Sequence, residues 1–456
     1  MIKTIKQTLA TLDGPHLIIN NGSERGDYIP CEKIHWSMGK IHNGVQLMKT
    51  YYPFDPAWDT KQRISVKSDQ SDKRYAWDFD YDDYDPYDLL ETASITRSQF
   101  EEIKQHGADI HLTLTLDMSL NDDELRKVFR PLANFGKIYL RVNHEANGYW
   151  FRHNTQHTFA EVAHFFQRSH TIAKSVSSQI MTVFSVSADV FVGDSINSVV
   201  RVDTSRLSVD ELGTALGVAD FWSIDKYVTL NWGWPYTTPA DSGNYFAGTI
   251  DTWWRLVEET YILMGHMNNG QLKPLFINEF NTDSDVVGEE GQADAIRKVY
   301  ERIRLSQFPW LRGICLYQFC DKGGLGLVKG DRDEFTEMPS LSAYREQAHE
   351  LDYQYHIENV EWPHKDFTFS WMDAENIRGL ALEFSENANL FTNQFITPVY
   401  LAHGSSWHRV KPNEKFNLTQ KSGFLFIPPS KKVHQERINF CHKIKNIRST
   451  LQSMVS

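Results

Sequence analysis

Two glutamates each end a strand-like apolar run, in positions that suit acid–base and nucleophilic chemistry. Glu145 follows the run YLRV at residues 139–142, and Glu279 follows the run PLFIN at residues 274–278. One carboxyl group can protonate a leaving oxygen, while a second attacks carbon or activates water. Most enzymes that cleave glycosidic bonds need such a pair, so the two glutamates predict a glycoside hydrolase.

The elements that would position these glutamates alternate between short apolar runs and longer helical patterns, from about residue 15 to residue 350. This alternation is typical of strand–helix units around a parallel sheet, and we expect a closed (β/α)8 TIM barrel. The carboxyl ends of its strands would hold the ligand site, where both glutamates meet. The expected strands lie near residues 17–20, 33–38, 110–116, 138–144, 180–186, 224–230, 274–279 and 313–319.

Helical patterns fall between these strands. Thr158 and Glu161 have capping-box spacing ahead of an apolar periodicity, and further helices are expected at about 249–266 and 292–306. After about residue 351 the pattern changes to short alternating strands without long helices, which indicates an all-β, sandwich-like module. The predicted organisation is therefore a catalytic barrel over residues 1–350 and a β-rich accessory domain over residues 351–456.

Strand alternation makes a prediction about the side chains before Glu145. Arg141, Asn143 and Glu145 should share one face, with His144 directed the other way near the rim. Arg141 could then be the partner that a buried Glu145 requires. A structural ion pair of Arg141 with Glu145 is the plain alternative to a catalytic role, because such pairs also occur away from active sites.

The pattern RxxHExNGxW starting at Arg141 resembles the acid/base strand of glycoside hydrolase family 26, whose best-known members are β-mannanases. The resemblance covers about residues 15 to 350. It implies that Glu145 is the general acid/base at the end of strand four. The shorter run FINEF, residues 276–280, looks like the strand-seven segment of this clan and gives Glu279 the role of nucleophile. A retaining double displacement is the implied reaction.

Residues for substrate binding are expected around the two glutamates. The resemblance implies a tyrosine that bonds the nucleophile, and Tyr227 is the nearest candidate, with core packing equally open. Tryptophans on a glycine-broken loop after the sixth strand suit sugar stacking. Asn147 could orient Glu145 or bond a sugar hydroxyl, or it could bond local backbone in a turn. The predicted set is Arg141, His144, Asn147, Trp150, Tyr227, Trp232, Trp234 and Tyr317.

The substrate is expected to be β-linked and most simply a β-mannoside, following the resemblance. Where this clan commonly places a strand-eight tryptophan, the run 315–321 offers Tyr317 or Phe319. β-1,3-Xylan and mixed-linkage β-glucan fit the same pattern, and a non-catalytic carbohydrate-binding protein is a further alternative. An insertion at about residues 52–100 could close one end of the site, which favours short oligosaccharides.

Bulk properties exclude other partners. The net charge is −12, which disfavours binding to nucleic acid. The sequence has no stretch of about 18 apolar residues, so we expect no membrane-spanning helix. No signal peptide is visible, so we expect a cytoplasmic protein; the sequence does not indicate an oligomeric state.

Neither a cofactor nor a metal is expected. The four cysteines match no zinc pattern, and we expect reduced thiols. No metal-binding helix motif is present among the histidines, which include His106, His153, His157, His164 and His170. The acidic run 78–88 has alternating acids like a calcium loop, but it lacks the glycine and final glutamate of an EF-hand.

Overall fold

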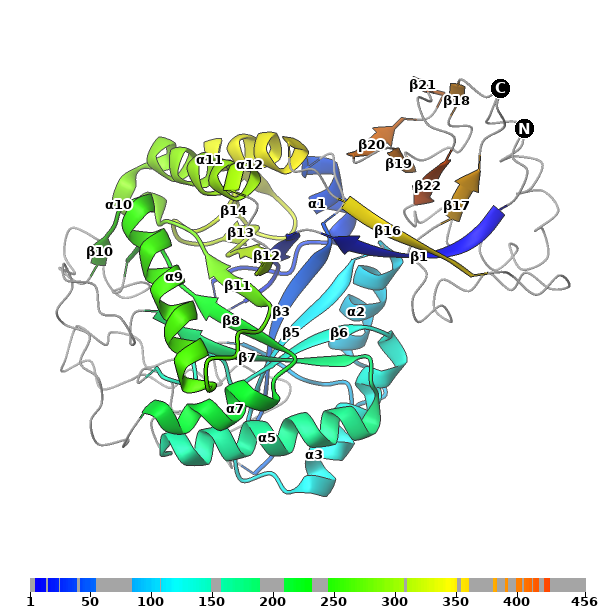
Figure 1. The fold of residues 1–456 in the computed structure, drawn as a ribbon. Coiled ribbons are helices and arrows are strands. Elements are labelled where there is room, and N and C mark those ends of the chain that lie inside the picture. The colour runs from blue at the N-terminus through cyan, green and yellow to red at the C-terminus, as the bar shows by residue number, and fades with distance from the viewer. Residues whose placement is uncertain are drawn as a thin grey trace, which may run out of the picture.

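The computed structural model describes residues 5–13, 15–23, 25–38, 42–54, 84–106, 108–148, 157–188, 209–231, 245–306, 310–350, 354–360, 380–383, 390–392, 399–403, 406–411, 413–417 and 422–426. Within these ranges, eight parallel strands form a closed barrel, which confirms the predicted (β/α)8 fold (Figure 1). Its strands in chain order are β2 (His16–Asn20), β3 (Gly44–Tyr51), β5 (Asp109–Leu116), β6 (Ile138–Val142), β7 (Ile180–Ser187), β8 (Phe221–Asp225), β11 (Leu275–Phe280) and β12 (Leu311–Leu316).

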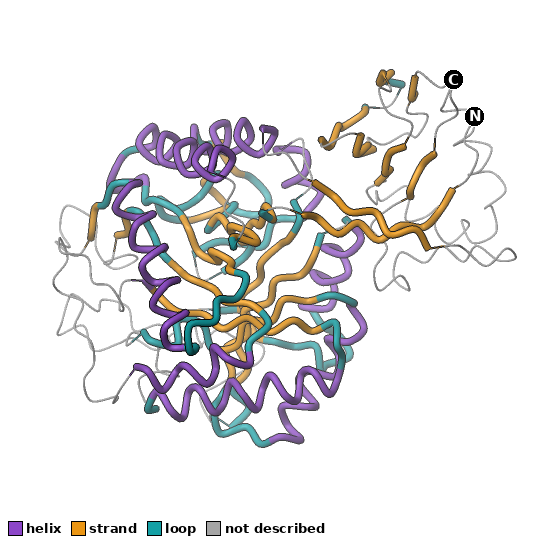
Figure 2. Tube along the Cα trace, in the orientation of Figure 1, coloured by secondary structure: helices purple, strands orange, loops and turns teal. Residues whose placement is uncertain are grey.

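Each barrel strand pairs with its chain neighbours, and β2 closes the ring by pairing with both β12 and β3. Helices surround the strands (Figure 2). These are α1 (Cys31–Met38), α2 (Ile95–Gln105), α3 (Asp122–Phe129), α5 (Phe159–Val176), α7 (Gly213–Val218), α9 (Ile250–Met267), α10 (Ser284–Val287), α11 (Glu289–Ser306) and α12 (Pro339–Glu350), with the 3-10 turns η3 (Arg130–Phe135) and η6 (Val209–Leu212). Short strands in the loops are β4 (Asp85–Pro86), β9 (Thr229–Asn231), β10 (Tyr245–Ala247), β13 (Cys320–Asp321), β14 (Val328–Gly330) and β15 (Phe335–Glu337).

The predicted strand at residues 33–38 is wrong, because this segment lies in helix α1. Cys31, Ile34, His35 and Met38 are buried at helical spacing, so the segment presents one face with a period of 3.6 rather than 2. The second barrel strand is β3 instead. The sixth strand also ends earlier than expected, at Asp225 rather than at residue 230.

The helix predictions are confirmed. The Thr158 side chain accepts from the backbone N–H of Glu161, whose carboxylate accepts from the Thr158 N–H, so α5 begins with a complete capping box. Helices α9 and α11 cover the ranges expected at 249–266 and 292–306 within a few residues.

Two sets of apolar side chains fill the two faces of the barrel wall. The larger set packs between strands and helices and includes Leu17, Leu140 and Ile314. Their alternating neighbours on the same strands form a separate cluster, which places them inside the barrel. That interior cluster consists of Ile18, Tyr139, Val183, Phe276 and Cys315.

A second sheet contains the strands after the barrel and also the first strand of the chain. Strand β1 (Ile5–Asp13) pairs antiparallel with β16 (Gln354–Val360) and with β17 (Leu380–Glu383) (Figure 1). The sheet continues through β22 (Ser422–Phe426), β19 (Val399–His403) and β20 (Ser406–Val410), and β18 (Leu390–Thr392) pairs with β21 (Lys415–Asn417). The domain boundary near residue 350 stays a prediction. The structure also shows that residues 5–13, at the start of the predicted barrel domain, belong to this second sheet. No helix in the described ranges is long and apolar enough to cross a membrane.

Candidate active site

Both glutamates lie at the carboxyl end of a barrel strand. Glu145 comes three positions after the end of β6, the fourth strand of the barrel, and Glu279 lies in β11, the seventh. In a (β/α)8 barrel this end carries the ligand site. Both side chains are largely buried, with residue exposures of 9% for Glu145 and 6% for Glu279.

An irregularity in β11 turns Glu279 into the barrel. Phe276 belongs to the interior cluster, so strict alternation would direct Asn278 inward and Glu279 outward. The pairing of β11 with β8 shifts register between Ile277 and Glu279, and Glu279 then lies opposite Asp225. A bulge of this kind re-aims a side chain next to a site.

Two donors hold the Glu279 carboxylate, one on each oxygen. Arg141 donates from Nη2 to Oε1 at 2.7 Å, and the Tyr227 hydroxyl donates to Oε2 at 3.0 Å. His144 adds a third contact, with Nε2 3.9 Å from Oε1. The predicted link between Tyr227 and the strand-seven glutamate is thus present in the structure.

Arg141 serves a second carboxylate, which the sequence analysis did not single out. Its Nη1 lies 2.6 Å from Oδ2 of Asp225, and its Nε donates to Thr113 Oγ1 at 2.7 Å. The expected partner of Arg141 was Glu145, whereas its ion pairs in the structure are with Asp225 and Glu279. A signal for Asp225 existed, because the apolar run FWSI at 221–224 also ends in a carboxylate.

The electrostatics of this group follow from burial and from the shared guanidinium. Burial lowers the pKa of Arg141, but the carboxyl groups of Asp225 and Glu279 outweigh that effect and raise it above its usual value, so the guanidinium stays charged. Burial raises the pKa of Asp225 to about 8; Arg141 opposes that rise and Glu279 adds to it. Asp225 also accepts from Ser185 Oγ at 3.1 Å. A proton on Asp225 would leave the Arg141 charge to Glu279.

The backbone after β6 departs from strand geometry and changes which side chains share a face. Asn143 has φ 45° and Glu145 has φ 51°, a left-handed conformation that is uncommon outside glycine. The Asn143 side chain bonds both backbone groups of Leu116 on β5, at 2.6 and 3.1 Å. The prediction that His144 points away from Arg141 is wrong, since both contact Glu279.

The Asn147 amide bonds backbone rather than the two glutamates. Its Nδ2 donates to the carbonyl oxygen of Ser187 and its Oδ1 accepts from the Ser187 N–H, each at 2.8 Å. These two bonds tie the loop after β6 to the end of β7. The assignment of Asn147 to substrate binding stays a prediction.

Tyr84, from the insertion after β3, reaches the site and was not predicted. Its hydroxyl lies 3.5 Å from Nε2 of His144, and its ring stands edge-on to the imidazole at 5.9 Å. Tyr84 is buried in an apolar cluster with Met48, Tyr317 and Leu325. The insertion therefore contributes a side chain next to the partners of Glu279.

Tyr317 follows the eighth barrel strand and packs against Tyr227. The two rings stand edge to face, with centroids 5.8 Å apart at 81°. The Tyr317 hydroxyl lies 2.8 Å from Ser23 Oγ, which donates in turn to Gln318 Oε1 at 2.9 Å. Because Ser23 has one proton to give, Tyr317 is the donor in their bond. Tyr317 thus packs against the ring of Tyr227, the residue that donates to Glu279. A contact between Tyr317 and substrate stays a prediction.

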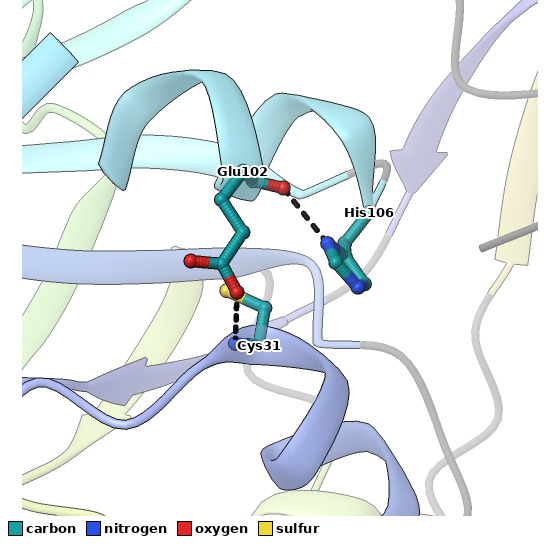
Figure 3. A group of neighbouring side chains, drawn as sticks. All are labelled: Cys31, Glu102 and His106. Atoms are coloured by element: carbon teal, nitrogen blue, oxygen red, sulfur yellow. Dashed lines mark hydrogen bonds between the residues drawn. The ribbon is translucent and has the colours of Figure 1, made fainter. Parts of the chain in front are cut away.

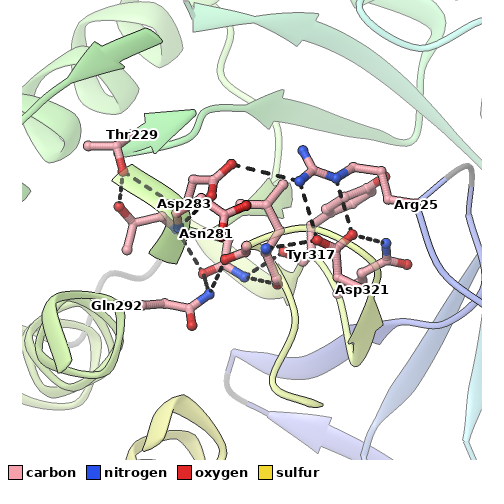
Figure 4. Close-up of polar contacts among 12 residues, drawn as sticks. Arg25, Thr229, Asn281, Asp283, Gln292, Tyr317 and Asp321 are labelled. Carbon is pink, nitrogen blue, oxygen red and sulfur yellow. Dashed lines mark hydrogen bonds and ion pairs between the residues drawn. The ribbon is translucent and has the colours of Figure 1, made fainter. Parts of the chain in front are cut away.

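A buried polar network joins the loops after strands one, seven and eight (Figure 4). Arg25, after β2, pairs with Asp321 at 3.1 Å and with Asp283 at 3.7 Å. Asn281, after β11, donates from Nδ2 to the carbonyl oxygen of Tyr317 at 2.6 Å. These contacts fix the loop that carries Tyr317 relative to the strand that carries Glu279.

Some predicted features lie outside the described residues. These are Trp150, Trp232 and Trp234, and residues 78–83 of the acidic run. In the rest of that run, Asp85 pairs with Lys49 at 3.3 Å, and Asp88 accepts from the N–H groups of Ile95 and Thr96 at the start of α2. Those two carboxylates thus have an ion-pairing and a helix-capping role.

Comparisons with known proteins show similarity in the backbone fold only. No family model matches the sequence, and a search of curated proteins found no match.

Three solved structures show the extent of the similarity. A family 39 glycoside hydrolase from Bacteroides cellulosilyticus has 12% identity and a TM-score of 0.43, over 91% of this chain and 81% of that chain. An α-L-arabinofuranosidase from Thermotoga maritima has 12% identity and a TM-score of 0.44, over 93% and 96%. An endo-β-1,4-glucanase from Xanthomonas axonopodis has 11% identity and a TM-score of 0.45, over 73% and 99%. These identities are too low to carry an activity from those proteins to this chain.

Proposed function

We propose that the protein is a retaining glycoside hydrolase, with Glu279 as nucleophile and Glu145 as general acid/base. The observation that carries the proposal is the Glu279 carboxylate, which is held on both oxygens by Arg141 and Tyr227 at the ligand-binding end of the barrel. His144, the residue beside Glu145, lies against the same carboxylate. A nucleophilic carboxylate and a neighbouring acid are the two groups that retaining cleavage requires.

The reaction would proceed in two displacements. In the first, a Glu279 oxygen attacks the anomeric carbon, the glycosidic C–O bond breaks, and the leaving oxygen takes the proton of Glu145. In the second, Glu145 removes a proton from water, which attacks the same carbon and frees Glu279. Arg141 and Tyr227 would stabilise the Glu279 carboxylate before attack and as it departs.

For the substrate, we propose short β-linked oligosaccharides, with β-mannosides first. The basis is the resemblance of the RxxHExNGxW pattern to family 26, to which Tyr227 beside Glu279 adds support. Tyr84 shows that the insertion after β3 reaches the site, which supports a role for it in selecting substrate length. A cytoplasmic location would agree with short substrates.

The test of the two roles compares variants on two leaving groups. Glu279→Ala should remove nearly all turnover of every β-mannoside. In kcat/KM, which reports the first displacement, Glu145→Ala should lose about 10²- to 10⁴-fold on unactivated oligosaccharides but little on a dinitrophenyl glycoside, whose leaving group needs no proton. On the dinitrophenyl glycoside kcat should still fall, because Glu145 is also the base of the second displacement. Glu290→Gln, an exposed residue at the start of α11, is the matched control and should keep wild-type rates. Equal losses on both leaving groups in Glu145→Ala would refute the acid role.

Product analysis decides the stereochemistry and the substrate. NMR of the first-formed sugar should show retention of the anomeric configuration, and inversion would overturn the double displacement. Reducing-sugar release should be greatest with manno-oligosaccharides in a screen that includes xylo- and gluco-oligosaccharides. Activity confined to xylan or glucan would replace the mannoside proposal, and binding measured by calorimetry without any release would indicate a carbohydrate-binding protein.

A further inference from the structure

A second group of reactive side chains lies between helices α1 and α2, on elements that do not carry Glu145 or Glu279. Cys31 is the first residue of α1, and Glu102 and His106 are one turn apart at the end of α2 (Figure 3). A sulfur, a carboxylate oxygen and a ring nitrogen from these three residues all lie within 4.8 Å of one another.

The donor set indicates which ion would suit the group. Thiolate, imidazole and carboxylate together are ligands for zinc, whereas calcium and magnesium take oxygen ligands alone. Zinc holds such donors at roughly 2.0–2.3 Å, which puts neighbouring donors of a tetrahedral site about 3.5 Å apart. Since the three atoms lie within 4.8 Å of one another, each pair would have to close by at most about 1.3 Å to reach this spacing.

Hydrogen bonds already orient the carboxylate toward the cysteine. Glu102 accepts from the backbone N–H of Cys31 at 2.6 Å through Oε1 and from the Tyr28 hydroxyl at 2.9 Å through Oε2. The same hydroxyl lies 3.7 Å from the Cys31 sulfur. Outer contacts of this kind orient first-shell ligands in known metal sites and strengthen binding.

The imidazole is also fixed in place. Nδ1 of His106 lies 2.8 Å from the backbone carbonyl oxygen of Glu102, one helical turn earlier. The ring of His35, from α1, stands at 66° to the His106 ring with centroids 4.8 Å apart. Cys31 and His106 are almost completely buried, while Glu102 is partly exposed. An ion would thus approach from the Glu102 side.

We propose that Cys31, Glu102 and His106 bind a zinc ion that joins helix α1 to helix α2. We assign it a structural role, because the ligands come from two helices that are far apart in the sequence; a water molecule would have to fill the fourth position of the tetrahedron. Helix α1 follows the loop that carries Ser23 and Arg25, so the ion would also anchor the loop that supports Tyr317. The proposal departs from the expectation, drawn from the sequence, that no metal is bound. The sequence alone does not show that Cys31 lies beside Glu102 and His106 on α2.

Metal binding has to displace the thiol proton. Burial raises the pKa of Cys31 well above its usual value, and Glu102 adds to the rise. Coordination to a divalent ion deprotonates a thiol outright, so zinc binding should release protons to the buffer.

The experiment titrates the full chain with zinc chloride after treatment with a chelator, using calorimetry and metal analysis. One zinc per chain is expected. Cys31→Ala and His106→Ala each remove a ligand and should weaken zinc binding by more than about 100-fold. Tyr28→Phe removes only a hydrogen bond to a ligand and should weaken it by about 10-fold. His164→Asn, an exposed histidine on α5, is the matched control and should bind as wild type.

Cobalt provides a second readout for the sulfur ligand. Wild type loaded with cobalt(II) should show a thiolate-to-metal charge-transfer band, and Cys31→Ser, which keeps the side-chain shape, should lack it. A wild-type chain that retains no zinc would overturn the proposal, as would undiminished zinc binding in Cys31→Ser or His106→Ala. Because the readouts are metal content and spectra, the outcome is independent of glycosidase activity.

Discussion

Arg141 and Asp225 are in direct contact in the interior, where Nη1 of the guanidinium lies 2.6 Å from Oδ2 of the Asp225 carboxyl group. Nη2 of the same guanidinium lies 2.7 Å from Glu279. Because the two carboxyl groups share one guanidinium, the protonation of Asp225 decides how far Arg141 is available to Glu279. Asp225 can therefore tune the proposed nucleophile without touching a substrate.

Replacing Asp225 with Asn should change how stability depends on pH. The folded-state pKa of Asp225 is about 8, raised by burial from 3.8, so between these values the native state keeps a proton that the unfolded chain has lost. This contribution is complete below about pH 4 and is lost as pH rises through about 8. Asn does not titrate, so the stability of Asp225→Asn relative to wild type should improve with pH, by at most about 1.4 kcal/mol per unit.

The measurement is urea unfolding from about pH 5 to about pH 8. Asp123→Asn, whose side chain is 95% exposed, is the control and should give a difference that changes little with pH. A constant difference between Asp225→Asn and wild type over this range would contradict the buried, protonated Asp225.

Replacing Arg141 with Met should destabilise the fold. The change leaves Glu279 buried without its cation, and above the pKa of Asp225 it leaves that carboxylate unpaired as well; breaking a buried ion pair costs about 3–5 kcal/mol. Arg141→Lys keeps the charge but cannot make the forked contact, so its loss should be intermediate. Denaturant unfolding checks both, and a loss below about 1 kcal/mol in Arg141→Met would show that the pairs contribute little.

Replacing Tyr227 with Phe should lower kcat, with little change in the free energy of unfolding. The variant loses the 3.0 Å bond to Glu279, and a hydrogen bond to a charged group contributes about 1.5–3 kcal/mol, or about 10- to 100-fold in rate. Tyr317→Phe loses the bond to Ser23 instead and is the matched comparison, with a smaller expected effect. Steady-state kinetics on a dinitrophenyl β-mannoside is the assay; equal effects in the two variants would argue against a direct role for Tyr227.

Replacing Gly26 with Ala should disturb the loop beside Arg25. A Cβ at this position would lie 1.9 Å from the carbonyl oxygen of Cys320, which is backbone and cannot rotate away. We expect a loss of about 1–3 kcal/mol in thermal or denaturant unfolding. Gly217→Ala, on helix α7, is the control, because its nearest atom is Asn268 Oδ1 at 3.3 Å and alanine favours helix. Similar stabilities for the two variants would contradict the tight loop contact.

The sequence predicted the parts of the site that depend on strand order. Glu145 and Glu279 were identifiable because a charged residue at the end of a buried strand stands out, and the barrel brings such ends together. Asp225 carries the same signal at the end of β8, but the strand was expected to continue to residue 230. Its boundary, rather than its chemistry, concealed it.

Other parts depend on local backbone geometry or on contacts between distant segments. The positive φ values of Asn143 and Glu145 accompany the contact of His144 with Glu279. Asn adopts positive φ more often than most residues, but Glu does not, so the residue types do not predict two such positions in three. The bulge in β11 inverts the face on which Glu279 lies, which a period of two cannot show. Tyr84 comes from an insertion whose path no periodicity describes.

The pairing of β1 with β16 has consequences for the folding of the newly synthesised chain and for the design of truncated versions. Residues 5–13 are synthesised hundreds of residues before their hydrogen-bonding partners at 354–360. Until then the first strand has an open edge, which favours unwanted association between chains. A truncation that ends at residue 350 would make this exposure permanent. A barrel-only version should therefore omit residues 5–13 together with the C-terminal strands.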